Sequence, residues 1–216
     1  MKVVIADDHK ILCEGLRVLL EKQPGVEVIG IARNGREVVK LALELLPDLV
    51  IMDIAMPDLN GIEATRQILL QNKAIKVVAL SMHSDSRYVH GMLSAGVSGY
   101  LLKDCAFEEL GRAVKAVSEN KVYLSPAIAG VVVESLKNNP GSAPIASKIA
   151  SISPREREVF QLLAEGNTIR DISQKLHLSI KTIETYRRQI MEKLGIRSIA
   201  ELTKYAIREG LTSAEA

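Results

Sequence analysis

The stretch "DLVIMDIAMPDLNG" at residues 48–61 places an acidic residue, Asp53, directly after the apolar run at residues 49–52. A short apolar run bounded by polar residues is typical of a buried strand in a parallel sheet. In open parallel sheets, ligands bind beyond the carboxyl ends of such strands. Met56-Pro57 then turns the chain away, and Asn60-Gly61 lets it tighten into the next helix. The stretch therefore predicts a buried strand that delivers Asp53 to the reactive edge of a sheet.

Five apolar runs of this kind alternate with amphipathic helical patterns. The runs lie at residues 2–6, 27–31, 48–52, 76–80 and 98–102, and the helical patterns lie near residues 10–21, 35–46, 62–71, 85–95 and 107–119. Regular strand–helix alternation predicts the α/β class with a doubly wound five-stranded parallel sheet. Right-handed crossovers leave few topologies, and five strands of this length suit the flavodoxin-like order 2-1-3-4-5.

The pattern changes after residue 120. Residues 125–136 predict one helix, with Ser125 as the N-cap and Pro126 at the first helical position. The following stretch, "KNNPGSAPIASKIAS" at residues 137–151, is rich in Pro, Gly, Ser and Asn, which is typical of a linker.

From Ser153 onward every pattern is helical. Ser153, Pro154 and Glu156 give the signature of a capped helix start. Four helices are expected, near residues 154–165, 168–176, 179–194 and 198–209. We therefore expect an α/β domain at residues 1–120, a linker helix and flexible linker at 121–152, and a smaller all-α four-helix domain at 153–216.

Composition sets broad limits on the class of protein. With 216 residues, 47% apolar and 25% charged, the chain can form two globular cores. It has no apolar run near the roughly 20 residues of a membrane span and no signal-peptide pattern, so we expect a cytoplasmic protein without a membrane partner. Cys13 and Cys105 lack a metal-ligand motif and are expected to be buried or half-buried thiols.

The net charge of +2 is unevenly distributed. Residues 1–120 carry 14 basic against 16 acidic residues, whereas residues 151–216 carry 11 against 9. A mildly basic tail is compatible with nucleic-acid binding but does not identify it.

Polar residues follow four of the predicted strands at their carboxyl ends: Asp7-Asp8, Asp53, Ser81 and Lys103. Because these ends meet at one edge of a parallel sheet, the side chains are expected to converge there. Three carboxylates form a hard oxygen site that suits Mg²⁺, a cofactor that also accepts phosphate oxygens. Asp53, the most central acid, is the candidate nucleophile for an aspartyl-phosphate. Lys103 and Ser81 are the candidate partners of the phosphoryl oxygens.

This set of residues, together with Met56-Pro57 and Asn60-Gly61, resembles the receiver domain of two-component response regulators over residues 1–120. The resemblance implies that Asp8, Asp53 and the backbone carbonyl of Ala55 bind Mg²⁺ directly, while Asp7 acts mostly through water. It also implies that a sensor histidine kinase donates the phosphoryl group from a phosphohistidine.

The resemblance further implies a switch, in which Ser81 moves toward the phosphate and Tyr100 turns inward. Its output surface is the face formed by residues 85–95, 98–102 and 107–119. Ala55 and His83 each lie two residues beyond a site residue, near the line of water attack. We hypothesise that they tune the lifetime of the phosphoryl group.

Residues 168–176 and 179–194 predict two helices joined by a short turn. Apolar residues at helical spacing predict a buried stripe: Ile172 and Leu176 in the first helix, and Ile180, Ile183, Ile190, Met191 and Leu194 in the second. The opposite face of the second helix carries a polar ridge: Lys181, Glu184, Thr185, Arg188 and Glu192. Such a ridge suits either a recognition helix in a major groove or a solvated face with an i,i+4 ion pair.

The sequence from Ser153 to Ile196 resembles the LuxR-type helix-turn-helix of the NarL/FixJ class, and the resemblance extends over about residues 151–212. Its marks are Ser153-Pro154-Arg155-Glu156, Glu165-Gly166, Lys181-Thr182-Ile183 and Lys193-Leu194-Gly195. The contacts that it implies are Glu184, Thr185 and Arg188 at base edges, and Lys181, Thr182, Tyr186 and Arg187 near phosphates.

Glu184 departs from the family pattern, because several relatives have a basic or neutral residue there. It can accept a hydrogen bond from cytosine N4, or repel phosphate and sharpen specificity. The class also implies a dimer face at Leu202, Tyr205 and Ala206 of the last helix. Two-fold symmetry then predicts an inverted-repeat site in double-stranded DNA.

We therefore predict a response regulator in which phosphorylation of Asp53 controls homodimerisation and DNA binding. It is not an enzyme beyond taking phosphoryl groups from small donors and losing its own. Three alternatives fit the sequence less well. A phosphohydrolase needs a second acid two residues after Asp53, where Ala55 stands. A phosphate-independent adaptor would not need the complete acid set with Ser81 and Lys103, which this sequence has. A tail that binds RNA or protein would not need the polar ridge of a recognition helix, which this sequence also has.

Overall fold

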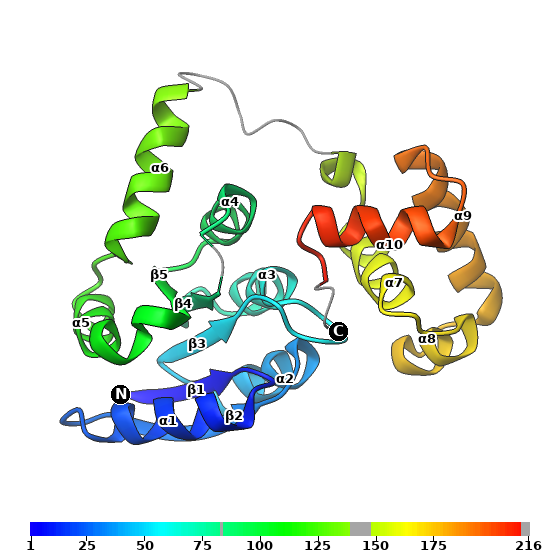
Figure 1. Cartoon of the computed structure of the whole chain (residues 1–216). Helices are drawn as coiled ribbons and strands as arrows, with labels where there is room; N and C mark the ends of the chain where they lie inside the picture. The colour runs from blue at the N-terminus through cyan, green and yellow to red at the C-terminus, as the bar shows by residue number, and fades with distance from the viewer. Residues whose placement is uncertain (83, 139–147, 213–216) are drawn as a thin grey trace. The chain divides into compact units, whose positions relative to one another are not determined.

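The structure is a computed structural model that describes residues 1–82, 84–138 and 148–212 (Figure 1). The described residues form two compact units, an N-terminal unit that holds residues 1–56 and 60–138 and a C-terminal unit that holds residues 148–212. None of the described helices is long and apolar enough to cross a membrane.

A parallel sheet in the order β2-β1-β3-β4-β5-β6 forms the centre of the N-terminal unit. Its strands are β1 (Lys2–Ala6), β2 (Glu27–Ala32), β3 (Leu49–Asp53), β4 (Lys76–Ser81), β5 (Gly99–Leu102) and β6 (Tyr123–Leu124). The first five strands have the order predicted from the sequence. Every residue of β3 is buried, which explains why its apolar run is unbroken.

The sixth strand was not predicted, and it extends the sheet at the β5 edge. β6 pairs with β5 in parallel, with Gly99 opposite Tyr123 and Tyr100 opposite Leu124. Two residues are too few to give a periodic signal in a sequence. The strand is followed by Ser125, whose N–H donates to the carbonyl of Tyr100 at 3.0 Å. That bond fixes the start of helix α6 (Pro126–Asn138) at this edge of the sheet.

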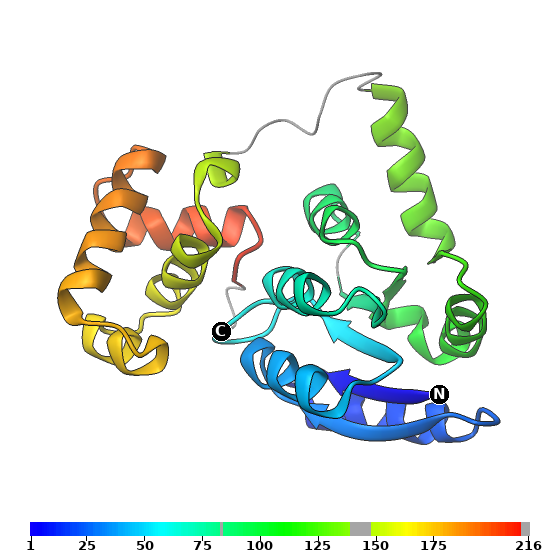
Figure 2. The same ribbon diagram turned by 180° about the vertical axis from the view of Figure 1, so that it is seen from behind.

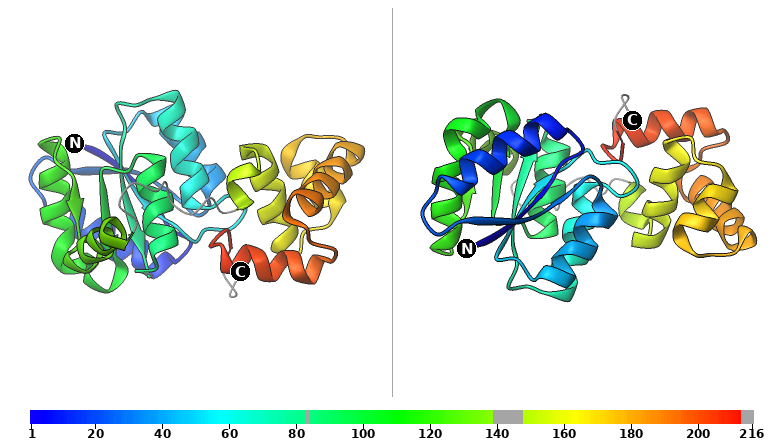
Figure 3. Two further views of the ribbon diagram at one scale, coloured as in Figure 1. Left: turned by 90° about the horizontal axis from the view of Figure 1, so that it is seen from above. Right: turned by 90° about the horizontal axis from the view of Figure 1, so that it is seen from below.

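Helices cover both faces of the sheet (Figures 2 and 3). One face carries α1 (Lys10–Glu21) and α5 (Ala106–Ser118), and the other carries α2 (Gly35–Leu45), α3 (Gly61–Gln71) and α4 (Ser86–Ala95). The side chains that the strands direct toward α1 and α5 form one core with Leu16, Leu20 and Leu110 of these helices. α6 packs against α4 and β5, so part of the output surface predicted from the sequence is covered within the chain itself.

The C-terminal unit is helical throughout its described residues. It contains a 3₁₀ turn at Lys148–Ser151 (η2), followed by α7 (Pro154–Ala164), α8 (Ile169–Leu176), α9 (Ile180–Leu194) and α10 (Ile199–Arg208). Hydroxyl side chains cap all four α-helices at their N-termini: Ser153, Thr168, Ser179 and Ser198. Ser153 and Glu156 form the capping box that the sequence predicted.

The core of this unit follows the predicted stripe except at one end. Ile172, Leu176, Ile183, Ile190 and Leu194 are buried, and Met191 packs against the core from a half-buried position. Ile180, however, is 50% exposed. It is the first residue of α9 and lies ahead of Ile183, where the helix enters the core. The prediction for Ile180 is therefore wrong.

Gly61 allows helix α3 to begin directly against the end of β3. A Cβ at this position would lie 2.0 Å from the carbonyl oxygen of Asp53, a distance that no side chain can occupy. Asn60 precedes it and accepts a hydrogen bond from the N–H of Glu63 at 3.0 Å, which caps the helix. The loop after Asp53 therefore depends on a residue without a side chain.

We predict that Gly61→Ala lowers the free energy of unfolding by about 1–3 kcal/mol, because backbone atoms must move to admit the methyl group. Chemical denaturation monitored by circular dichroism measures the loss. Gly130→Ala is the matched control. A Cβ at that position in α6 meets nothing within 4 Å, so the control should be neutral or stabilising. Equal effects of the two substitutions would contradict the prediction.

Candidate functional site

A buried ion-pair cluster lies at the carboxyl edge of the sheet. Asp7 follows β1, Asp53 ends β3, and Lys103 follows β5. The ammonium of Lys103 lies 2.7 Å from Asp7 Oδ2 and 2.9 Å from Asp53 Oδ2. All three side chains are buried. The fold thus joins three residues that the sequence separates by about 50 positions each, as predicted from the strand ends.

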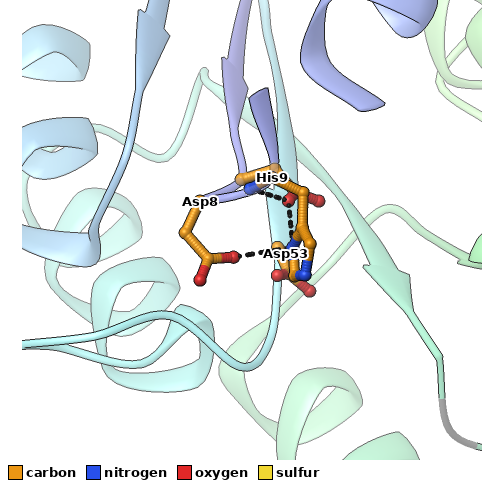
Figure 4. Close-up of side chains that lie close together, drawn as sticks. Asp8, His9 and Asp53 are labelled. Atoms are coloured by element: carbon orange, nitrogen blue, oxygen red, sulfur yellow. Dashed lines mark hydrogen bonds and ion pairs between the residues drawn. The ribbon is translucent and has the colours of Figure 1, made fainter. Parts of the chain in front are cut away.

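Backbone and ring donors fix the second oxygen of each carboxylate. Asp53 Oδ1 accepts from the N–H of Ile54 at 2.7 Å, and Asp7 Oδ1 accepts from the N–H of His9 at 2.9 Å. The imidazole Nδ1 of His9 also lies 3.0 Å from Asp7 Oδ1 and 2.9 Å from Asp8 Oδ1. Figure 4 shows the polar ends of Asp8, His9 and Asp53 close together. His9 was not predicted as a site residue, although it directly follows the two acids in the sequence.

These residues fit a divalent cation. Asp7, Asp8, His9 and Asp53 each offer a ligand atom, and these atoms lie within 4.8 Å of one another. The buried oxygens Asp7 Oδ2 and Asp53 Oδ2 face Lys103, and no further hydrogen-bond donor reaches them from the part of the chain that the structure describes. Carboxylates with free lone pairs suit Mg²⁺, which binds oxygen and retains waters.

The electrostatics of the cluster follow from its burial. Burial raises the pKa of Asp53 to about 6, the carboxylate of Asp7 adds to the rise, and Lys103 opposes it. Burial also acts to lower the pKa of Lys103, but Asp53 and Asp7 outweigh it, so the pKa lies above its ordinary value. Lys103 therefore stays charged, whereas ionisation of Asp53 lowers the stability of the folded protein.

Ser81 and Tyr100 occupy neighbouring positions beside this cluster. Ser81 ends β4 and Tyr100 lies on the adjacent strand β5, and both are buried. Burial raises the pKa of the Tyr100 phenol to about 12, while its hydrogen bond with Ser81 acts in the opposite direction. Ala55 is half-buried in the loop after Asp53. His83, the other residue that we expect to tune the phosphoryl lifetime, lies outside the described residues.

The strand that carries Tyr100 is also bonded to the linker helix. Besides the Ser125 N–H bond to the Tyr100 carbonyl, the Ser125 hydroxyl donates to Glu109 Oε2 of α5 at 2.6 Å. Ser125 and Glu109 are both buried. Tyr100, α5 and the residue that precedes the linker helix are therefore held together by hydrogen bonds.

The cysteines carry no chemistry in this arrangement. Both are free, with Cys13 buried and Cys105 half-buried, as expected. Burial raises the pKa of the Cys13 thiol, which disfavours the reactive thiolate.

In the C-terminal unit, α8 and α9 form a helix-turn-helix. His177 adopts a left-handed conformation with φ of 52° at the end of α8, and Ser179 caps α9. Two cross-links hold the pair against α7. Lys193 pairs with Glu156 Oε2 at 2.7 Å, and Arg155 Nη2 donates to the carbonyl of Leu176 at 2.9 Å. The last residue of α8 and the last turn of α9 are thus each bonded to α7.

The predicted DNA contacts on α9 differ in exposure. Lys181, Glu184 and Arg188 are exposed, whereas Thr182, Thr185, Tyr186 and Arg187 are half-buried. A hollow in this surface is lined by Glu184, Arg187, Arg188 and Met191. The Thr185 hydroxyl donates to the carbonyl of Lys181 at 2.9 Å, so its proton already has a partner.

The structure contradicts the predicted dimer face at two of its three residues. Leu202 and Ala206 are fully buried in the core of the C-terminal unit, where α10 packs on α7. They have no accessible area for a second chain. Tyr205 is half-buried, stacks on Phe160 with ring centroids 6.3 Å apart, and carries Arg208 over its ring. The apolar residues Leu202 and Ala206 of α10 therefore belong to the core of the unit.

We predict that Asp53→Asn stabilises the metal-free protein at pH 7.5 by about 1–3 kcal/mol, with the gain disappearing below about pH 4. The pKa of Asp53 in the fold, about 6, lies above its ordinary value of 3.8. The folded state therefore binds this proton more tightly than the unfolded chain, and ionisation of Asp53 destabilises the fold as the pH rises. Asparagine mimics the protonated acid at every pH, and Lys103 keeps Asp7 as its partner.

Urea unfolding across this pH range in the presence of EDTA measures the effect. The exposed Asp104→Asn is the control and should show no comparable change. A gain for Asp53→Asn that persists unchanged at pH 4 would contradict the electrostatic origin.

Comparison with known proteins agrees with these features. Residues 3–115 match the family described as response regulator receiver domain, and residues 150–206 match the bacterial regulatory proteins of the luxR family. The chain is 36% identical to the response regulator GacA of Pseudomonas aeruginosa, over 99% of both chains. It is also 36% identical to the transcriptional regulatory protein LiaR of Bacillus subtilis, over 99% of this chain and all of that one.

Among solved structures, the RcsB response regulator of Salmonella typhimurium is similar, with a TM-score of 0.59 and 28% identity over 95% of this chain and 97% of that one. A second similar structure, with a TM-score of 0.59 and 28% identity over 95% of this chain and 96% of that one, is an RcsB–DNA complex. The chain belongs to the two-component response regulators of the NarL/FixJ class, with a receiver domain followed by a LuxR-type helix-turn-helix DNA-binding domain.

Proposed function

We propose that Asp53 accepts a phosphoryl group from the phosphohistidine of a sensor histidine kinase, and that this modification controls DNA binding by the C-terminal unit. The observation that supports it most is the buried cluster of Asp53, Asp7 and Lys103 at the carboxyl edge of the sheet. A buried carboxylate beside a buried ammonium is suited to receive an anionic group, because Lys103 can neutralise the charge that the group brings.

In this reaction a carboxylate oxygen of Asp53 attacks phosphorus, and the bond between phosphorus and the histidine nitrogen breaks. The imidazole leaves with the electron pair of that bond, so the ionised carboxylate needs no general base. Ile54 holds Asp53 Oδ1 through its N–H, which orients the carboxylate during the attack. Lys103 and Ser81 then bind phosphoryl oxygens.

Asp7, Asp8, Asp53 and the carbonyl of Ala55 are the proposed Mg²⁺ ligands. When bound, the cation reduces the repulsion between the phosphoryl group and the carboxylates.

The phosphoryl state is proposed to reach the linker through Ser81 and Tyr100. If Ser81 turns to the phosphoryl group, it gives up its hydrogen bond to Tyr100. The backbone carbonyl of Tyr100 accepts the hydrogen bond from the Ser125 N–H. A movement of Tyr100 would therefore directly affect the start of α6. Phosphorylation biases this hydrogen-bonded element between two states and thereby favours the DNA-binding homodimer.

The proposed target is double-stranded DNA with inverted-repeat half-sites, read by α9. Arg188 is exposed on α9 and can donate two parallel hydrogen bonds to a guanine edge. Lys181 lies at the exposed start of the same helix, where it can contact phosphate. The solved RcsB–DNA complex belongs to a relative of similar length and supports DNA as the target.

We expect incubation with a small phosphodonor such as acetyl phosphate and Mg²⁺ to add one phosphoryl group to the intact chain, detectable by mass spectrometry. Asp53→Asn should abolish the addition, because an amide is not a nucleophile toward phosphorus. Asp104→Asn should be labelled normally. Retention of the label in Asp53→Asn would refute Asp53 as the acceptor, and absence of any label in the parent chain would favour a phosphate-independent adaptor.

We expect Arg188→Ala to weaken specific DNA binding by about 1–3 kcal/mol while phosphorylation of Asp53 is unchanged. The reason is the loss of a base-edge contact that no neighbouring side chain replaces. Lys40→Ala removes a charge from the exposed surface of α2 and is the control. Fluorescence anisotropy on DNA selected from a genomic library, with RNA of the same sequence as competitor, measures the DNA affinity of both variants. Mass spectrometry after incubation with acetyl phosphate measures their phosphorylation. Equal losses in the two variants would exclude a specific role for Arg188.

A further inference from the structure

His9 is an additional potential ligand in the acidic pocket. It precedes α1 as its N-cap residue, but its side chain does not cap the helix. Instead, its Nδ1 lies between one oxygen of Asp7 and one oxygen of Asp8, and the ring is otherwise 66% exposed (Figure 4). A surface imidazole turned back onto two carboxylates is therefore a feature that the phosphoryl chemistry of Asp53 does not use.

The spacing of these atoms matches neighbouring ligands of one cation. Two ligand atoms that each lie about 2.1 Å from a metal at right angles are about 3.0 Å apart. Nδ1 of His9 lies 2.9 Å from Asp8 Oδ1 and 3.0 Å from Asp7 Oδ1. The same distances suit hydrogen bonds from an Nδ1 proton, which is the arrangement that a metal-free pocket requires. The same positions of His9 Nδ1 and the two carboxylate oxygens therefore suit both the metal-free and the metal-bound pocket.

We infer that His9 is a nitrogen ligand that makes this pocket favour transition-metal cations such as Co²⁺, Ni²⁺, Cu²⁺ and Zn²⁺ in addition to Mg²⁺. The inference rests on the proposed cation site, which it extends by one residue. Imidazole nitrogen binds these cations strongly, whereas Mg²⁺ prefers carboxylate and water oxygen. His9 therefore changes which metal the pocket holds and leaves Mg²⁺ binding to the carboxylates.

A metal would bind the neutral imidazole of His9 through the Nδ1 lone pair. The neutral imidazole carries one proton, which can reside on Nδ1 or on Nε2. With the proton on Nδ1, the ring donates to the acids. With the proton on Nε2, the Nδ1 lone pair faces the pocket, and the exposed part of the ring can donate to water. Asp7 stays oriented in both forms, because the backbone N–H of His9 also donates to its Oδ1 at 2.9 Å.

His9→Asn in the full chain tests this inference. Asparagine can still donate a hydrogen bond to the acids and is a good N-cap residue, but it offers no imidazole nitrogen. Isothermal titration with Co²⁺ should show at least a tenfold weaker Kd than in the parent chain, whereas the Kd for Mg²⁺ should change less than twofold. His90→Asn, on α4, is the control and should alter neither value.

Spectroscopy provides a readout independent of affinity. Bound Cu²⁺ should show nitrogen hyperfine coupling in its electron paramagnetic resonance spectrum, which His9→Asn should remove, and excess Mg²⁺ should displace Co²⁺ from the parent chain. An equal loss of Co²⁺ and Mg²⁺ affinity in His9→Asn would overturn the inference and make His9 a positioning residue for the acids. Unchanged Co²⁺ binding would also overturn it. Failure of the parent chain to bind Mg²⁺ would instead contradict the proposed cation site.

Discussion

The rest of the N-terminal unit depends on one buried ammonium, Lys103, held between two buried carboxylates. Charges in a protein interior are tolerated only when they are paired, so Asp7, Asp53 and Lys103 fix the ends of β1 and β3 and the start of η1 (Lys103–Cys105) against one another. Two carboxylates and one ammonium leave a net charge of −1. Burial is the main cause of the raised pKa of Asp53, the negative charge of Asp7 adds to it, and a bound cation would offset both. The ionised, metal-free pocket therefore destabilises the folded protein, and either binding of a metal or protonation of Asp53 would reduce this effect.

The segment that carries Lys103 also connects the pocket to the rest of the chain. Tyr100 lies three residues before Lys103 on β5, and its carbonyl accepts the hydrogen bond that starts α6. Only two residues of the chain thus separate Lys103 from the residue that holds the start of α6, so the proposed signal from Asp53 would need no long relay. The coverage of α4 and β5 by α6 has a related consequence. Any partner that uses this face must compete with the linker helix or bind beside it.

The sequence predicted what depends on periodicity and strand ends, and failed where tertiary packing decides. The order of five strands and the convergence of Asp7, Asp53 and Lys103 follow from alternation and from the rule for parallel sheets. β6 is too short to produce a pattern. Leu202 and Ala206 were assigned to a dimer face from the family resemblance, and the packing of α10 in this chain buries both in the core. His9 was missed because a histidine beside two acids has many uses, and only the direction of its ring distinguishes them.

The contacts of α9 also narrow what its polar ridge can read. The Thr185 hydroxyl gives its proton to the Lys181 carbonyl, and the Thr182 hydroxyl is bonded to Ser179 at the cap. In the proposed complex with DNA, Thr185 would accept from an amino group of cytosine or adenine. The Glu184 carboxylate would also accept, so Arg188 would be the donor among these three residues. One donor and two acceptors would favour a guanine beside cytosine or adenine, and the charge of Glu184 would repel a misplaced phosphate. On this proposal, unfavourable contacts would contribute to specificity alongside favourable ones.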